Sequence, residues 1–498
     1  TTSGLTDVVV VGYGTSRKKD LTGAVTSVKE KDFNKGVFTS PDQLIQGKVA
    51  GVQVLNNSGQ PGGAATVKIR GNAAIVAGAS NQPLYVVDGV PLDGRTARPD
   101  IGIAGVGSSP AANPLNFINP NDIASMEVLK DASATAIYGS RAAFGVILIT
   151  TKRGQSGQPS LTVNSSVGTS SILKRLEVLD GDQYRQALKD YGLTTGDLGG
   201  NVDALDAILQ NGKLQNYSMA ISGGNENGRY RLSAGFMDQN GIIRKSGFRK
   251  FTTNFTGNYK FLESKKLGLD INVIASQTRE QIAPVSNDAG FTGSVVGQAL
   301  QWNPTNPLRK ADGSLNILVG STTVNPLAMS EAYDDIAKTT GILASIAPYY
   351  NITKDLQYKV QYSVNYGTGI RRSQIASFIN LENIYNRGWA LYANNELTTH
   401  QLTHTLNYNK QISSSLYLSA LAGYEYMKFD NKGANMNARD FGAYPVPYTN
   451  YFQYSTQGSR GIGSFADPTV ELQSYFARAV LNFKDRYIFT GTFRADGS

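Results

Sequence analysis

Residues Asn119–Gly154 read NPNDIASMEVLKDASATAIYGSRAAFGVILITTKRG, and this stretch decides how the rest of the chain is interpreted. It opens with an Asn-Pro turn, continues through an apolar run over 123–129 and closes with a β-branched run over 145–151. Between the two runs lie small residues, with Asp131 placed to cap a helix and Gly139 placed to stop it. The pattern predicts a strand, a short helix and a second strand, in a compact unit without a catalytic side chain.

Five shorter motifs precede this stretch, and together with it they resemble the plug domain of SusC/RagA-type TonB-dependent outer-membrane transporters. In chain order they are VVVVGYG at 8–14, LTGAV at 21–25, QGKVAGV at 46–52, VKIRG at 67–71 and PLYVVDGVP at 83–91. The resemblance covers residues 7–154. It implies a mainly β protein: a small α+β plug domain in the lumen of a transmembrane antiparallel β-barrel of about 22 strands. It also implies a multi-pass location in the outer membrane of a Gram-negative bacterium.

The composition agrees with a β-rich envelope protein. The 498 residues include no cysteine, which excludes disulfides, cysteine metal sites and a thiol nucleophile. The net charge of +9 is spread along the chain, whereas a nucleic-acid footprint would be clustered on one face, so we expect no nucleic-acid partner. The mean hydropathy of −0.25 is compatible with a barrel, because lipid-facing and lumen-facing residues alternate along its strands.

Beyond Gly157 the sequence alternates between apolar and polar residues in segments of about ten residues, which is typical of transmembrane β-strands. Over 356–366 the alternation is perfect, and over 267–276 only Ile274 breaks it. We expect the apolar side to face lipid and the polar side to face the lumen. A soluble β-sandwich also alternates, but it does not normally need strands this long. Segments 281–337 and 431–469 are rich in Asn, Gly, Tyr and Pro, and we interpret them as extracellular loops.

The composition and the residue pattern divide the chain into three parts. Residues 1–14 form a linker with a candidate TonB box, residues 15–156 form the plug domain, and residues 157–498 form the first part of the barrel with long extracellular loops. The last part has room for about 10 to 14 strands of barrel length. A barrel that small does not enclose a plug of this size, so we expect only the N-terminal part of the barrel in this chain.

The N-terminal segment is the part of the chain that we expect to couple the plug to TonB. The resemblance implies that the box which pairs by strand addition with the periplasmic domain of TonB lies at Asp7, Val8, Val9, Val10 and Val11, or upstream of Thr1. Two other interpretations stay open for these valines. They also suit a buried plug strand, and Gly12-Tyr13-Gly14 begins like a dinucleotide fingerprint, although position 17 is Arg where the third Gly would stand.

Charged residues of the plug have two predicted roles. We assign structural roles to Arg70, Gly71, Asp88, Gly89 and Arg141. For Arg70 and Arg141 these are ion pairs within the plug or against the barrel wall, with direct ligand contact as the alternative. The loops at 72–81 and 92–113 are Gly- and Ala-rich, and the resemblance implies that they face the substrate. Asp93, Arg95 and Arg98 are the candidate ligand-facing residues there, with ordinary solvated loop charges as the alternative.

Catalytic chemistry is not predicted. The two histidines, His400 and His404, lie on a strand-like segment without a third ligand, so we expect barrel-wall residues and no metal site. The sequence has no G-x-S-x-G elbow and no P-loop. We therefore predict no enzyme activity, no cofactor and no catalytic residue.

The resemblance implies TonB-dependent import of an oligomeric nutrient, glycan or peptide. Its expected partners are a SusD-like surface lipoprotein acting as a lid, TonB, outer-membrane lipid and the oligomeric ligand, with a dimer of SusC–SusD pairs as a possible assembly. The alternative is a SusC-like barrel that serves as a structural or assembly subunit of a larger outer-membrane complex without transport. A passive porin is disfavoured, because a plug would block it. The sequence does not distinguish a saccharide from a peptide.

Overall fold

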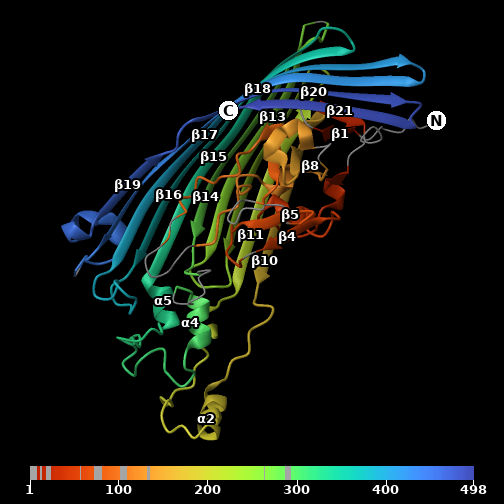
Figure 1. Ribbon diagram of the computed structural model, residues 1–498. Helices are drawn as coiled ribbons and strands as arrows, with labels where there is room; N and C mark the ends of the chain where they lie inside the picture. Colours follow the sequence, from red (N-terminus) through yellow and green to blue (C-terminus); the bar gives the residue numbers. More distant parts are fainter. Residues whose placement is uncertain are drawn as a thin grey trace.

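The computed structural model describes most of the 498 residues. The described ranges are 8–11, 14–17, 24–56, 58–71, 81–100, 102, 109–131, 135–262, 264–285, 293–442 and 444–498. Two bodies make up the described chain: a small mixed unit within residues 24–151, and a long antiparallel sheet that curves around it (Figure 1).

The plug unit is built on a five-stranded sheet in the order β3-β8-β9-β6-β7. Its centre is the stretch Asn119–Gly154. β8 (Ile123–Leu129) pairs antiparallel with β9 (Val146–Thr151), and the short 3-10 helix η5 (Ala136–Ala142) connects them, which confirms the predicted strand, helix and strand. The other members are β3 (Val25–Lys29), β6 (Leu84–Val87) and β7 (Val90–Pro91). β3 is an edge strand, and it is the one nearest in sequence to the N-terminus.

Two details of that central stretch differ from expectation. Gly139 lies inside η5, with φ of 68° and ψ of −155°, so it interrupts the helix and does not end it. The Asp131 side chain does not stay local: it accepts a hydrogen bond from the backbone N–H of Ala24 at 2.6 Å. It therefore fastens the start of β3 to the end of β8.

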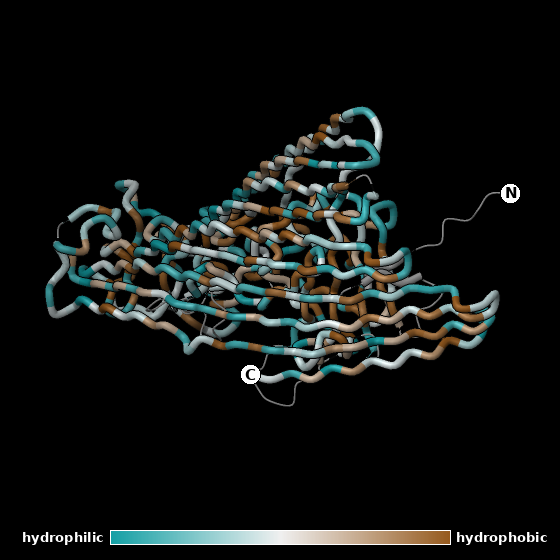
Figure 2. The backbone as a smooth tube through the Cα atoms, turned by 90° about the horizontal axis from the view of Figure 1, so that it is seen from above, coloured by the Kyte–Doolittle hydropathy of each residue, from teal (hydrophilic) through white to brown (hydrophobic). Residues whose placement is uncertain are grey.

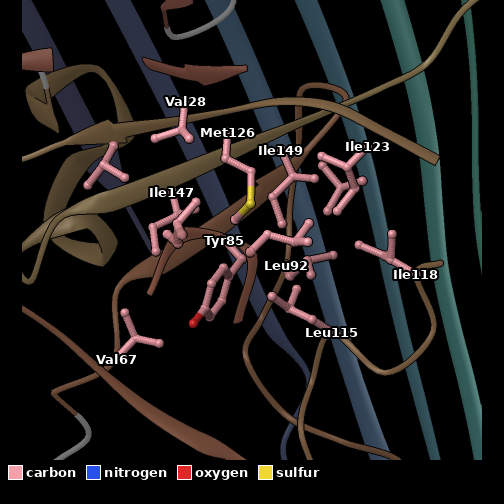
Figure 3. Close-up of a cluster of buried hydrophobic side chains, with 14 of the residues drawn as sticks. Val28, Val67, Tyr85, Leu92, Leu115, Ile118, Ile123, Met126, Ile147 and Ile149 are labelled. Carbon is pink, nitrogen blue, oxygen red and sulfur yellow. The ribbon is translucent and has the colours of Figure 1, made fainter. Parts of the chain in front are cut away.

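A second hairpin and the loops around it complete the plug. β4 (Val52–Asn56) pairs antiparallel with β5 (Ala65–Ile69). The 3-10 turns are η2 (Glu30–Asp32), η3 (Pro41–Ile45) and η4 (Pro120–Asp122). Both sheets contribute to one apolar core, in which Val67, Tyr85, Met126 and Ile147 lie close together (Figure 3). A second apolar cluster, which includes Val86, Ile137 and Leu148, packs against Phe476 of the long sheet.

The long sheet has twelve strands, and each is paired antiparallel. The order follows the sequence from β10 to β18 and then runs through β20 to β21, while β19 pairs with the far end of β18. The strands are β10 (Gly157–Ser170), β11 (Gly212–Gly224), β12 (Gly228–Asn240), β13 (Gly247–Phe261), β14 (Leu267–Gln281), β15 (Tyr333–Asn351), β16 (Leu356–Ile375), β17 (Trp389–Ser413), β18 (Leu416–Arg439), β19 (Gly461–Ala466), β20 (Val470–Phe483) and β21 (Tyr487–Gly497).

Apolar and polar residues alternate along strands of this sheet (Figure 2), and their exposure shows that the alternation corresponds to its two faces. On β13 the Phe251 side chain points outward and is 52% exposed, whereas its neighbour Thr252 points toward the plug and is 3% exposed. Ile274, the residue that breaks the pattern of β14, faces inward and is buried in the plug core together with Leu343 of β15. The irregular position is thus explained by contact with the plug.

The connections between strands differ at the two ends of the sheet. At one end they are short, over 225–227, 262–266, 352–355, 414–415 and 484–486. At the other end the connection over 241–246 is short, and the others, over 171–211, 282–332, 376–388 and 440–469, are long. The long connections carry α2 (Gly181–Asp190), α3 (Ala204–Ile208), α4 (Val295–Gln301), α5 (Pro326–Ala332), η6 (Tyr448–Asn450), η7 (Phe452–Tyr454) and η8 (Gln457–Ser459).

The expected loops at 281–337 and 431–469 are shorter than predicted. β15 already begins at Tyr333, and β18 continues to Arg439. These strand ends are rich in polar residues, so the apolar alternation stops before the backbone pairing does. The connections over 171–211, 282–332 and 376–388 nevertheless share an apolar core, in which α3, α4 and α5 bury a cluster that includes Ile208, Val295 and Met329.

At the N-terminus, β1 (Val8–Val11) pairs antiparallel with β2 (Gly14–Arg17) in a short hairpin. Asp7 lies outside the described residues. Among the helices of the described chain, none combines the length and the apolar character needed to cross a membrane.

Candidate functional site

The candidate site is the interface between the plug and the inner face of the long sheet, here called the wall. Charged side chains are concentrated in it, although both surfaces are largely buried. Arg98 of the plug and Glu280 of β14 form an ion pair with 2.7 Å between Nη1 and Oε2, and their side chains are only 1% and 3% exposed. A buried pair of this kind fixes geometry, because removing either partner leaves an uncompensated charge.

A wall arginine supports the same plug loop. Arg371 of β16 is completely buried and pairs with Asp335 of β15, with 2.6 Å between Nη2 and Oδ2. Its Nη1 also donates to the backbone carbonyl of Pro99 at 3.1 Å. The loop that follows β7 is therefore held from two sides, by the pair at Arg98 and by the carbonyl contact at Pro99.

A second cluster holds η5 against the wall. Glu425 of β18, fully buried, accepts hydrogen bonds from Arg141 of the plug at 3.2 Å and from Arg494 of β21 at 2.9 Å. Arg494 also donates to the carbonyl of Ile137 at 2.6 Å. The interrupted conformation of η5 lets Gly139 lie directly against Arg494 and Asp496, where a Cβ atom would collide. Close approach thus explains why glycine occupies this position.

A third cluster lies on the strands nearest the start of the sheet. Asp122, at the end of η4, accepts hydrogen bonds from Arg231 at 2.7 Å and from the Ser233 hydroxyl at 2.8 Å, both on β12. Lys250 of β13 donates to the carbonyls of Thr39 and Ile118, each at 3.0 Å. Wall side chains therefore hold plug backbone as well as plug side chains.

The turn between β6 and β7 is hydrogen-bonded both to the plug and to the wall. Asp88 adopts a left-handed conformation, with φ of 48°, and Gly89 follows with φ of 83°. The Asp88 carboxylate accepts from the backbone N–H of Thr151 at 3.0 Å, from its hydroxyl at 2.6 Å and from Asn272 of β14 at 2.5 Å. This turn is therefore tied to β9 within the plug and to the wall.

The remaining residues with predicted structural roles lie as follows. Arg70 forms an ion pair with Asp131 at the plug surface, and Gly71 next to it has φ of 91°. Arg141 contacts Glu425, as described above. These positions are compatible with structural roles, which stay predictions.

The three predicted ligand-facing residues are not equivalent. Arg95 is 40% exposed and pairs with Asp93 at 2.9 Å and with Asp467 at 3.4 Å, so its guanidinium lies at an accessible surface, whereas the Asp93 side chain beside it is only 9% exposed. Arg98 instead points into the wall and is buried there. The expectation that Arg98 faces the ligand is not met, because its charge is compensated by Glu280 and not by solvent. The segments 72–80 and 103–108 lie outside the described residues.

Two carboxylates are buried within the plug. Asp42 accepts hydrogen bonds from Ser40 at 2.9 Å, from Asn113 at 2.7 Å and from Tyr85 at 3.2 Å. Burial raises the pKa of Asp42 despite these bonds. Burial also raises the pKa of Glu127, which accepts from Ser27 on β3 at 3.2 Å. In contrast, the hydrogen bond from Ala24 and the nearby Arg70 lower the pKa of Asp131.

A polar cavity of about 510 Å³ separates part of the plug from the wall at the short-turn end. Asp88, Gly89 and Arg153 line it from the plug side. The wall side consists mostly of residues of β16, β17, β18 and β20, together with Asp270 of β14, Asn351 of β15 and the turn at 352–355 at its edge. The interface therefore combines tight ionic contacts with a preformed space.

The described chain offers no candidate metal site. No cluster of three or more potential metal-ligating His, Asp or Glu side chains occurs among the described residues. His400 and His404 lie on β17, where each ring Nδ1 is within hydrogen-bonding distance of a tyrosine hydroxyl, of Tyr362 at 2.9 Å and of Tyr358 at 2.7 Å. The two histidines are thus individual wall residues.

The sequence interpretation missed most of the wall residues of the interface. The signal was available, because each is a charged residue on the polar side of an alternating strand. These residues are Arg231, Lys250, Glu280, Asp335, Arg371, Glu425 and Arg494. A charge that is buried between the wall and a plug needs a partner, either on the plug or on a neighbouring wall strand.

Comparison with known proteins agrees with this arrangement. Residues 17–146 match the family model of the TonB-dependent Receptor Plug Domain. The chain is 33% identical to the TonB-dependent receptor SusC of Bacteroides thetaiotaomicron over 99% of its own length and 49% of that protein. It is 34% identical to the TonB-dependent receptor P3 of Formosa agariphila, over 99% and 47% respectively.

Among solved structures, that of the RagAB peptide importer in the 'open-open' state shares the fold, with a TM-score of 0.80 and 23% identity over 98% of this chain and 56% of that one. The chain spans about half the length of the curated relatives it matches. Its sheet accordingly forms part of a barrel. TonB-dependent transporters are not a class of enzymes. The plug, the partial barrel and the similarity over the whole chain together place this protein among the SusC/RagA-type TonB-dependent transporters of the outer membrane.

Proposed function

We propose that this protein imports an oligomeric nutrient, a glycan or a peptide, across the outer membrane with energy delivered by TonB. The observation that carries the proposal is a folded plug held against the inner wall of a partial barrel by buried ion pairs. Such a plug closes a pore at rest, so transport requires a force that rearranges it. The similarity to TonB-dependent receptors over 99% of the chain supports TonB as the source of that force.

The topology of the plug provides a route for the force. The edge strand β3 follows the N-terminal hairpin in sequence, and it pairs on one side only, with β8. We propose that Asp7, Val8, Val9, Val10 and Val11 form the TonB-contact segment and that tension on it reaches the plug through β3. An antiparallel edge strand pulled from one end separates one hydrogen-bonded pair after another, which requires less force than separating all pairs together.

The partners and the domain division are part of the same proposal. We assign the short-turn end of the sheet to the periplasm and the long-connection end to the outside, as in other outer-membrane barrels. A SusD-like surface lipoprotein would cover the long connections as a lid, lipid would surround the outer face, and pairs of the two proteins would form dimers. We propose that the chain consists of a linker at 1–14, a plug domain at 15–156 and the first part of the barrel at 157–498. We propose no catalytic step and no cofactor.

The role that we propose for each plug residue is based on its contacts in the structure. Arg70, Gly71, Asp88, Gly89 and Arg141 hold the plug together and against the wall. Of the candidate ligand-facing residues, Asp93 and Arg95 remain, because Arg95 lies at an accessible surface of the plug and Asp93 pairs with it.

The test is uptake by cells that carry the full-length protein with residues 7–11 deleted. We expect uptake to be lost while the purified protein still binds its ligand, since coupling and binding reside in different segments. Mass spectrometry of the complex extracted in mild detergent supplies the second readout. A SusD-like lipoprotein and a bound oligomer in the complex support import. Unimpaired uptake after the deletion refutes the coupling role, and a complex with assembly factors but no ligand favours a scaffold.

A further inference from the structure

The cavity beside the plug has a composition that indicates a ligand. Its volume of about 510 Å³ is within the range of small-molecule sites, roughly 300–1,000 Å³. Much of its wall side consists of neutral amide and hydroxyl side chains, among them Gln361, Thr403, Thr405, Asn407, Asn409 and Ser419. These groups both donate and accept hydrogen bonds, as do the hydroxyl and amide groups of a polar oligomer.

The acidic side chains of the cavity are largely occupied. Asp270 pairs with Lys359, with 3.0 Å between Oδ2 and Nζ. Asp88 accepts three hydrogen bonds, from Thr151 and Asn272. Asp355 and Lys354 are neighbours in the turn at the edge of the cavity, with opposite charges. The lining thus holds three carboxylates, Asp88, Asp270 and Asp355, against four cations, Arg153, Lys354, Lys359 and Arg478.

Two arginines of the lining have no such compensation. Arg478 projects from β20 on the wall side, and Arg153 follows β9 on the plug side. Within the described ranges, neither guanidinium has a hydrogen-bond or ion-pair partner, and the Nε of Arg478 is enclosed by protein. A guanidinium carries five N–H donors, and an enclosed donor without an acceptor is costly.

These observations favour an anionic ligand. Guanidinium groups bind carboxylate, sulfate and phosphate groups through paired N–H donors, and they do so most strongly where water is partly excluded. The space is far larger than a single ion needs, and neutral polar side chains make up much of its wall side. A polar molecule that bears an anionic group fits both parts of the cavity.

We propose that this cavity is a binding site for an anionic group carried by the transported oligomer, with Arg153 and Arg478 as the residues that bind it. The inference rests on the proposed import function and deepens it, because it places a charged substituent on the substrate. It also locates a stage of transit on the side of the plug that faces β16 to β20.

The experiment measures binding to the purified full-length protein in detergent by isothermal titration calorimetry. The probes are a tetrasaccharide of uronic acid, the same tetrasaccharide with its carboxyl groups reduced, a neutral tetrapeptide with a free C-terminal carboxylate, its C-terminal amide, and sodium sulfate alone. The variants are Arg478→Gln, Arg153→Gln and their combination. Arg249→Gln is the matched control, because Arg249 is exposed, pairs with Asp238 and lies outside this cavity.

We expect one anionic oligomer to bind, and its affinity to fall about tenfold or more with either substitution, as when a charge-assisted hydrogen bond is lost. The control should change nothing, and the neutral counterpart of the same oligomer should bind weakly in all variants. Whether the saccharide or the peptide responds identifies the source of the anionic group. Thermal unfolding of each variant checks that the fold is kept.

Three results would overturn the proposal: no anion-dependent binding by any probe, equal binding by wild type and the double variant, or sulfate binding as tightly as the oligomers, which marks a site for a free ion. Binding in detergent needs neither TonB nor residues 7–11. A failure of uptake coupling therefore leaves this test unaffected, and a failure of this test leaves the import proposal standing.

Discussion

Arg98 of the plug and Glu280 of the wall form a salt bridge that is almost completely withdrawn from water, with 2.7 Å between Nη1 and Oε2. Three residues away, Arg95 forms pairs of similar length with Asp93, but at an exposed surface. One loop thus presents two arginines in opposite environments. The contrast makes the energetic role of each pair testable within the same protein.

Replacing Arg98 by Ala should destabilise the docked plug strongly, because Glu280 would be left buried and unpaired. The expected cost is about 3–5 kcal/mol, as for other buried pairs that lose one partner. Arg95→Ala should cost about 0–1 kcal/mol, since exposed pairs contribute little. Limited proteolysis and thermal unfolding of the full-length protein measure both. Equal effects of the two substitutions would show that burial does not govern this pair.

Substitutions of Asp131 separate a hydrogen bond from an ion pair. Asp131→Asn removes the charge facing Arg70 but keeps an acceptor for the Ala24 N–H, so it should have little effect. Asp131→Ala removes both, and the loss of the hydrogen bond costs about 0.5–1.5 kcal/mol. Hydrogen exchange of the β3 amides should therefore speed up severalfold in the Ala variant only. Faster exchange in the Asn variant as well would assign the effect to the ion pair.

Replacing Gly139 by Ala should loosen the contact between η5 and the wall. The new Cβ would meet Asp496 and lie 2.9 Å from Nε of Arg494, which adds overpacking of about 1–3 kcal/mol to the strain of a positive φ. Gly94→Ala is the control, with φ of 82° but no atom within 4 Å of the added Cβ. It should cost only the backbone strain, about 1–2 kcal/mol. A midpoint of thermal unfolding equally lowered in both would refute the steric argument.

The buried Asp42 predicts a pH dependence of plug stability. Because burial raises the pKa of the folded carboxyl, the folded state binds a proton more tightly than the unfolded state. Stability should therefore fall as the pH rises from about 4, near the unfolded pKa. The fall ends when the pH passes the raised folded pKa. Asp42→Asn cannot ionise and should remove this component. Thermal unfolding of the wild type and of the variant between pH 4 and 8 gives the comparison, and parallel curves would exclude Asp42 as the source.

The plug sheet and the barrel strands were predictable because both follow from local patterns. The apolar run at 123–129 and the β-branched run at 145–151 each form a strand, and the alternation over 356–366 separates the two faces of β16. The loop limits at 281–337 and 431–469 were less accurate, because the strands continue past the apolar band, where alternation no longer accompanies pairing.

The site was less predictable, and Arg98 shows why. In sequence it is one of several charges in a Gly-rich loop, and only the position of Glu280, 182 residues away, makes it a buried wall contact. Arg153 and Arg478 were likewise unremarkable in the sequence, since the absence of a partner becomes visible only when all neighbours are in place.

The sequence by itself determined the family, the plug, the partial barrel and the side of each strand that faces lipid, because these depend on residue order and on a period of two. Only the tertiary structure decided which charges meet across the plug and the wall and which stay uncompensated beside the cavity. The physical reason is that electrostatic compensation depends on distances of a few ångströms between residues far apart in the chain, and no local pattern encodes those distances.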